Sequence, residues 1–124
     1  MKTFFVLTLI MILSSCSAKF SETNYNTMLD LVITTRDSSE VCSSNENMIK
    51  SYKLIRDDSI RILEHSAGRK DTDVTKMIKD LYIEIDNFGT QLTKNKVSIF
   101  YCKSKIENIN HGARTILNAE GGKL

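Results

Sequence analysis

Two histidines, His65 and His111, and three cysteines are the side chains in this chain best suited to metal or redox chemistry. The histidines lack the Glu-x-x-His or His-x-x-x-His spacing that places two ligands on one helix face. In a helical bundle they could approach the same level, where Glu64 or Asp57 could join them. Because two surface histidines explain this pattern better, the sequence predicts no metal site.

The sequence contains no arrangement of residues typical of an enzyme. It has neither a nucleophile elbow nor a phosphate-binding P-loop. A catalytic pair of carboxylates would need burial to shift its pKa, whereas solvation explains acidic residues on helical faces. We therefore expect no catalytic residues, no cofactor and no enzyme activity. The acidic residues considered are Asp57, Asp58, Asp80, Glu84 and Asp86.

The first 18 residues have the pattern of a cleavable signal peptide. Lys2 supplies a positive charge, residues 4–13 are apolar, and the small residues 14–18 follow. The apolar run is too short to cross a bilayer as a helix, since crossing needs about 20 residues. A buried helix at the start of the domain is the alternative. It fits less well because the run is apolar on all sides. The pattern predicts export, with residues 19–124 forming a single domain.

Two cleavage sites compete after the apolar run. The residues Leu13-Ser14-Ser15-Cys16 resemble the lipobox of bacterial lipoprotein precursors, in which a Leu, two small residues and a lipidated Cys follow the apolar region. The resemblance implies cleavage before Cys16, lipidation of its thiol and, with Ser17 next, an address at the outer membrane. Cleavage after Ala18 would instead release a soluble protein beginning at Lys19.

Either cleavage leaves Cys42 and Cys102 as a pair, which is expected to form a disulfide in an oxidising compartment. Such a bond would contribute about 4 kcal/mol in the chain-entropy model. When the chain is folded back at residues 68–72, Cys42 falls opposite position 98, about one helical turn from Cys102. This spacing suits an antiparallel helical pair or a closed bundle. The alternative is two separate buried thiols.

Size and charge limit the function classes further. The mature chain is long enough for one domain with a modest core, and too short for two. The whole chain has 17 basic and 15 acidic residues. Loss of Lys2 with the signal leaves a nearly neutral domain, which argues against a nucleic-acid binder. The chain has no proline, and this suits long uninterrupted helices.

Apolar residues recur at helical spacing in three stretches of the domain. The first stretch, residues 25–33, predicts a short helix that ends near residues 36–39. Thr34 and Thr35 weaken this helix, so a strand is the alternative there. The second predicts a helix over residues 45–67, started by a capping box of Ser43 with Glu46 and ended by Gly68. The faces predicted to be buried contain Tyr25, Met28, Leu29, Val32, Ile33, Met48, Ile49, Tyr52, Ile55, Ser59, Ile62 and Leu63.

The third stretch, residues 73–118, keeps a heptad pattern for about six heptads. Either one helix spans it, or two helices meet between Gly89 and Asn95. A single helix would be about 70 Å long and helix propensity is weak around Asn95, so we favour a turn there. The apolar stripe contains Val74, Ile78, Leu81, Ile85, Phe88, Leu92, Ile99, Cys102, Ile106, Ile109, Ala113 and Ile116, with the polar Asn95 in its middle.

Charge is unevenly distributed along the third stretch. Residues 71–91 are mainly acidic and residues 93–124 mainly basic. We interpret this as a solvated helix surface with complementary neighbours. The alternative is a basic face that meets anionic lipid headgroups or an acidic partner.

Together these observations predict an all-α fold, a small antiparallel three- or four-helix bundle with one disulfide. The alternative is an extended helical hairpin that dimerises. The expected function is that of an exported binding or interaction protein at the cell envelope, of the accessory, exclusion or lysis-control kind. The expected address is the periplasm or the outer membrane, with Cys16 as the membrane anchor. The expected partner is another protein, not nucleic acid, and a homo-oligomer is compatible with the pattern. A soluble secreted effector or ligand-binding protein is the alternative, and an enzyme is disfavoured.

Overall fold

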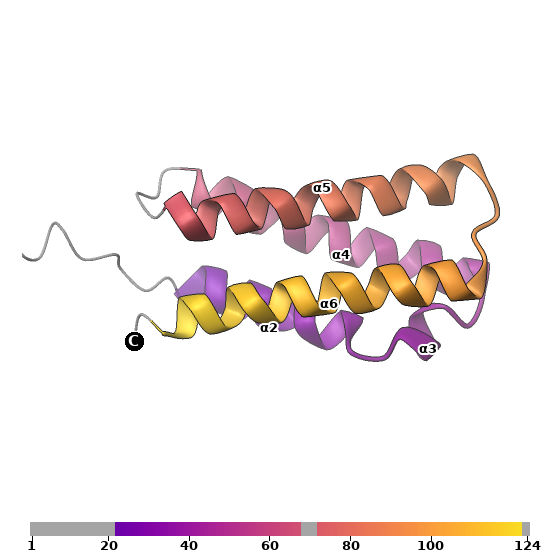
Figure 1. The fold of residues 1–124 in the computed structure, drawn as a ribbon, viewed down its shortest axis with the longest axis horizontal. Coiled ribbons are helices and arrows are strands. Elements are labelled where there is room, and N and C mark those ends of the chain that lie inside the picture. Colours follow the sequence, from indigo (N-terminus) through magenta and orange to yellow (C-terminus); the bar gives the residue numbers. More distant parts are fainter. Residues whose placement is uncertain (1–21, 68–71, 123–124) are drawn as a thin grey trace, which may run out of the picture.

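The computed structural model describes residues 22–67 and 72–122 (Figure 1). The described residues form five helices and no strand, so the prediction of an all-helical protein is confirmed. The signal peptide, Cys16, Gly68 and Asp71 lie outside the described residues. The helices are α2 (Glu22–Thr35), α3 (Ser38–Val41), α4 (Asn45–Ser66), α5 (Thr72–Lys94) and α6 (Ile99–Gly121).

The helices pack together as an antiparallel bundle. Helix α2 packs against α4 and α6, and α5 packs against the same two helices. Consecutive long helices run in opposite directions, so α3 and the α5–α6 turn lie at one end of the bundle (Figure 1). The chain enters α2 and leaves α6 at the other end. The chain turns at residues 95–98, as favoured from the sequence, so residues 73–118 form two helices.

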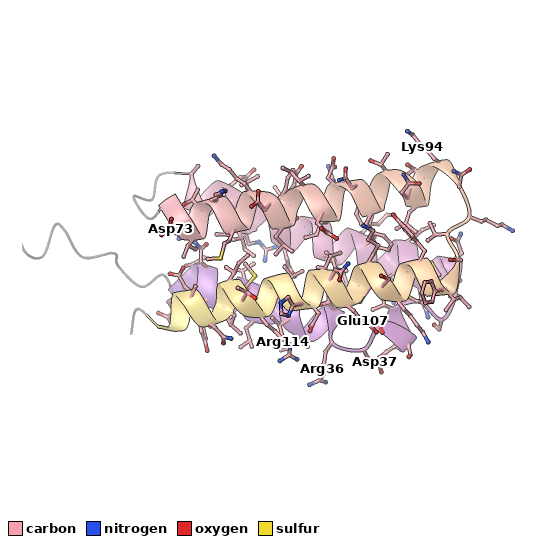
Figure 2. All side chains as sticks on the ribbon, in the orientation of Figure 1. Arg36, Asp37, Asp73, Lys94, Glu107 and Arg114 are labelled. Atoms are coloured by element: carbon pink, nitrogen blue, oxygen red, sulfur yellow. A yellow bond between two sulfur atoms is a disulfide. The ribbon has the colours of Figure 1, made fainter. Side chains whose placement is uncertain are left out.

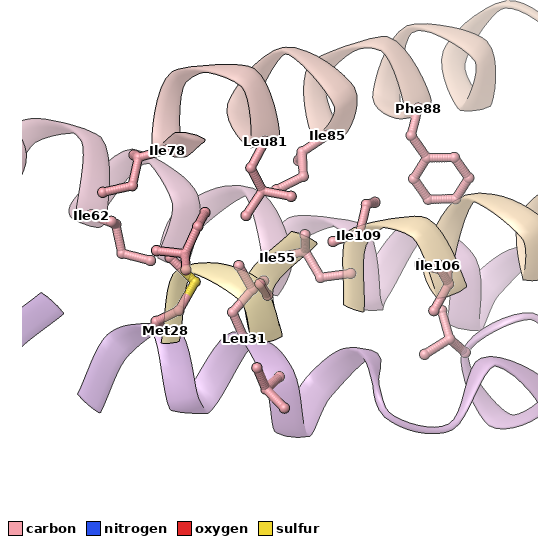
Figure 3. Close-up of a cluster of buried hydrophobic side chains, with 14 of the residues drawn as sticks. Met28, Leu31, Ile55, Ile62, Ile78, Leu81, Ile85, Phe88, Ile106 and Ile109 are labelled. Carbon is pink, nitrogen blue, oxygen red and sulfur yellow. The ribbon is translucent and has the colours of Figure 1, made fainter. Parts of the chain in front are cut away.

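The core is built from the predicted apolar stripes. Side chains of α5 point toward those of α2, α4 and α6 in Figure 3, where they form one continuous cluster. Ile85, Phe88, Ile106 and Ile109 are completely buried. Burial of each such side chain contributes about 1.5–3 kcal/mol, so this stripe is the main source of stability. Asn95 is exposed in the turn and costs the core nothing.

Four residues of the predicted apolar faces are exposed instead of buried. They are Leu29, Ile33, Ile49 and Ile99. The first three lie at the edges of their helical stripes, one position away from the centre of the packed face. Ile99 is the first residue of α6 and lies at the end of the bundle, directly after the turn. Helical spacing marks the correct side of a helix, but the width of the buried stripe depends on neighbouring helices.

The start of α4 differs from the prediction by one residue. Ser44, not Ser43, is the N-cap, and its hydroxyl accepts a hydrogen bond from the Asn47 amide at 3.1 Å. The Ser43 amide and hydroxyl both donate to the Glu40 carbonyl, which closes the single turn of α3. Because the Ser43 amide donates to the Glu40 carbonyl, the predicted capping box of Ser43 with Glu46 does not form. The cause is α3 itself, which the sequence pattern did not predict.

The predicted pairing of Cys42 with Cys102 is confirmed. The two residues form a disulfide, with their Cα atoms 5.8 Å apart. Cys42 follows α3 and Cys102 lies in the first turn of α6, and both are fully buried. The bond therefore fixes the junction of α3 and α4 against α6. The alternative of two separate thiols is contradicted.

Three aromatic side chains pack next to one another near this end of the bundle. The Phe88 ring meets Tyr52 edge-on, with centroids 6.2 Å apart, and lies 6.5 Å from the Tyr101 ring. The Tyr52 phenol occupies the space directly above Gly89, where a Cβ atom would overlap it. Gly89 therefore allows Tyr52 of α4 to approach the backbone of α5.

We expect Gly89→Ala to lower the free energy of unfolding by about 1–3 kcal/mol, because the new methyl group must displace the Tyr52 ring. In a Tyr52→Ala background the same substitution should raise it by about 1 kcal/mol, since alanine is the better helix former. Urea unfolding followed by circular dichroism measures the unchanged chain, the two single variants and the double variant. An equal effect of Gly89→Ala in both backgrounds would contradict the Tyr52–Gly89 contact.

Candidate interaction surface

The two histidines do not come together. His65 lies on α4 and His111 on α6, and both are exposed. These helices lie across the bundle from each other, because each packs mainly against α2 and α5. In the described parts of the chain, no group of three or more His, Cys, Asp or Glu side chains is placed to hold a metal ion.

The acidic residues considered for catalysis do not come together in one place. Glu84 of α5 forms an ion pair with Lys105 of α6 at 3.6 Å. On the opposite side, Asp58 of α4 is partly buried, and this burial raises the pKa of its carboxyl group above the usual 3.8.

Asp58 belongs to an acidic cluster between α2 and α4. The negative charges of Asp30 and Asp57 raise the pKa of Asp58 further, while Arg61, 3.7 Å away, lowers it. Asp30 and Asp57 are thus close enough to Asp58 to act on it electrostatically, and Arg61 opposes their effect. The outer face between α2 and α4 therefore carries three neighbouring acidic side chains.

A groove of about 410 Å³ continues along the same face toward α3. Its walls are the end of α2, the short helix α3 and the first half of α4. Ile33 of α2 and Leu54 of α4 line it, and each side chain is 53 % exposed. Polar and charged side chains complete the lining, among them Arg36, Asp37, Glu40, Asn47, Lys50 and Ser51.

The break between α2 and α3 creates this groove. The Thr35 hydroxyl donates to the Leu31 carbonyl at 2.8 Å in the last turn of α2. Asp37 then caps α3 by accepting from the amides of Ser39 and Glu40. The redirected chain no longer follows α4, which leaves the hollow between them. Figure 2 shows Arg36 and Asp37 at this bend, on the outside of the molecule.

The other side of α2 is held firmly against α6. The Asn110 amide group donates to the Val32 carbonyl at 3.1 Å and to the Thr35 hydroxyl at 3.0 Å. These bonds anchor the end of α2 from the α6 side. The groove on the α4 side therefore has one wall that is fixed in position.

Ile33 and Leu54 are the feature of the groove that most needs explanation. Completing the burial of two half-exposed aliphatic side chains would gain roughly 1 kcal/mol each. Scattered apolar residues on a surface need no explanation, but a pair that lines a concave site with a polar rim is typical of an interaction site. The helical spacing of the sequence predicts Ile33 in the core and gives no prediction for Leu54. The only sequence signal for Leu54 is that it is apolar and lies beside the buried stripe of α4, not on it.

A second hollow, of about 250 Å³, lies between α5 and α6. Gly112 lines it together with Met77 and Leu81. It lacks half-exposed apolar side chains on facing helices, and the ion pair of Glu84 with Lys105 lies beside it. The groove between α2 and α4 is the better candidate site.

Comparisons with protein-family models, with curated proteins and with solved structures found no match. Among the helices that the structure describes, none is both long and apolar enough to cross a membrane.

Proposed function

We propose that this chain is an exported binding protein of the cell envelope that acts by holding another protein, without chemistry of its own. The observation that carries the proposal is the groove lined by the half-exposed Ile33 of α2 and Leu54 of α4. A partner that inserts an apolar side chain between them gains binding energy from surface that the free protein leaves in water.

The charges around the groove indicate the chemistry of the partner. Within the groove Arg36 and Lys50 balance Asp37 and Glu40. Beyond it lie the carboxylates of Asp30, Asp57 and Asp58, together with Arg61. A segment that presents an apolar anchor followed by lysine or arginine residues would match this order, because opposite charges guide encounter and fix the register of docking.

Export is the second part of the proposal. The buried disulfide between Cys42 and Cys102 supports the proposal that the protein functions in an oxidising compartment. The signal pattern and the lipobox-like residues ending at Cys16 support the same address. We propose that lipidated Cys16 anchors the domain in the periplasm, at the outer membrane. Accessory, exclusion and lysis-control roles fit a protein of this kind.

Cleavage after Ala18 would instead make the protein a soluble extracellular effector or ligand-binding protein. The groove would serve either form. An enzyme is the least supported alternative, because the residues best suited to chemistry, His65 and His111, lie on separate exposed faces.

A photo-crosslinking residue in place of Leu54 should give one discrete product in the native host, because the partner lies against this wall. The same residue in place of Ile83, on the outer face of α5 and 56 % exposed, should give none. Ile33→Asp should abolish the product with little change in melting temperature, since its side chain is half exposed. Equal products from positions 54 and 83 would contradict the proposal. A product of twice the chain mass that contains only this chain would show that the partner is a second copy of the chain.

If Cys16 carries the lipid, Cys16→Ser should move the protein from the membrane fraction to the soluble fraction, or block its processing. Ser17→Ala is the matched control and should leave both unchanged. Cell fractionation and the mass of the mature N-terminus measure the effect. Unchanged size and fractionation of Cys16→Ser would favour cleavage after Ala18.

A further inference from the structure

The first two residues of α6, directly after the turn from α5, are exposed and apolar, and Phe100 is the most exposed large apolar residue of the described chain. Phe100 is 84 % exposed and Ile99 is 55 % exposed. Ser98 caps α6 by accepting a hydrogen bond from the Tyr101 amide at 3.1 Å, which fixes the helical phase of these residues. Since Cys102 occupies the buried face, Phe100 lies about 200° around the helix from it. The fold therefore holds Phe100 in water.

The same segment carries lysines and no acidic residue. Between Asp86 and Glu107 the sequence contains no aspartate or glutamate. Lys105 pairs with Glu84 and also lies over the Tyr101 ring. Three other lysines in this interval form no ion pair with the described part of the chain: Lys94, Lys96 and Lys103.

The position of this segment is as informative as its composition. It forms a convex end of the bundle, opposite to the end where the described chain begins and finishes (Figure 1). Figure 2 shows Lys94 at this end and Asp73 at the other. The acidic residues Glu40 and Glu46 belong to the same end but lie on α3 and the first turn of α4. The corner formed by α5 and α6 is thus apolar at its centre and basic around it.

We infer that this corner, residues 94–103, binds an anionic lipid surface. Phe100 and Ile99 enter the interfacial region of the bilayer, and the three lysines meet the phosphates of the headgroups. A specific protein interface needs about 800 Å² of complementary surface on each partner, which a convex corner is poorly shaped to offer. A bilayer adapts to the corner and supplies both an apolar layer and negative charge.

This inference goes beyond the proposed groove function and does not depend on it. The corner lies at the far end of a bundle whose α5 alone is about 34 Å long. A domain anchored through Cys16 could therefore touch a second lipid surface with this corner. A soluble form would have the corner as its own means of membrane attachment.

The chain contains no tryptophan, so a single introduced tryptophan reports one position. We expect the full chain carrying Phe100→Trp to show a blue-shifted emission with phosphatidylglycerol-containing vesicles. Brominated lipid should quench this emission. Vesicles of phosphatidylcholine alone should produce little change, because the lysines then lack their counter-charge. A second chain, which carries Ile83→Trp as its only tryptophan, is the matched control. It reports insertion elsewhere, including attachment through the N-terminus.

The lysines are tested in the Phe100→Trp chain. Each should contribute about fivefold to the affinity for anionic vesicles. Lys94→Gln with Lys96→Gln should therefore require more than about tenfold more anionic lipid for the same shift. Lys76→Gln with Lys79→Gln, on α5 away from the corner, should change it less than about twofold.

Three results would overturn the inference. The first is a water-like emission of Phe100→Trp with both kinds of vesicle, which would leave the corner to a protein partner. The second is an equal shift of Ile83→Trp. The third is an equal shift with neutral and anionic vesicles. Because none of these readouts involves Ile33 or Leu54, their outcome is separate from that of the groove experiment.

Discussion

The bond between Cys42 and Cys102 is the constraint on which the arrangement of this bundle depends. It joins residues 60 apart in sequence and fixes the junction of α3 and α4 to the first turn of α6. In the chain-entropy model such a closure stabilises the fold by about 4 kcal/mol. That is a large fraction of the 5–15 kcal/mol typical of a protein's free energy of unfolding. Because the bond lies at the end that contains α3 and the α5–α6 turn, it also determines where two surfaces stand. One wall of the groove is formed by α3, and the exposed corner, residues 94–103, includes Cys102 itself.

The long helices could be predicted from the sequence because their apolar stripes are regular. The stripe from Val74 to Ile116 continues through the turn almost unbroken, so periodicity alone did not separate α5 from α6. The length of a single helix and the weak propensity around Asn95 favoured the turn, and the structure has it. The details of the ends were less accessible. The hydroxyls of Ser43 and Ser44 both suit a cap, and the choice between them depends on α3, a single turn with no periodic signal.

The groove could not be predicted because it belongs to no single helix. It forms where the chain bends between Thr35 and Ser38 and where α4 passes beside that bend. Ile33 has the spacing of a core residue, and only the absence of a neighbouring helix on its side leaves it exposed. Leu54 of α4 is exposed for the same reason. Local spacing describes one helix at a time, whereas exposure is a property of the packed set. Phe100 is different, because its place two residues before Cys102 already puts it opposite the buried face of α6.

The state of Cys42 and Cys102 in protein taken from its native compartment tests most directly the claim that this is an exported bundle closed by a disulfide. The unfolded chain is treated with a thiol reagent before and after reduction, and peptide masses distinguish these two residues from Cys16. We predict that neither Cys42 nor Cys102 reacts before reduction and that both react after it. Two labelled thiols in unreduced protein would contradict both the covalent closure and the oxidising address.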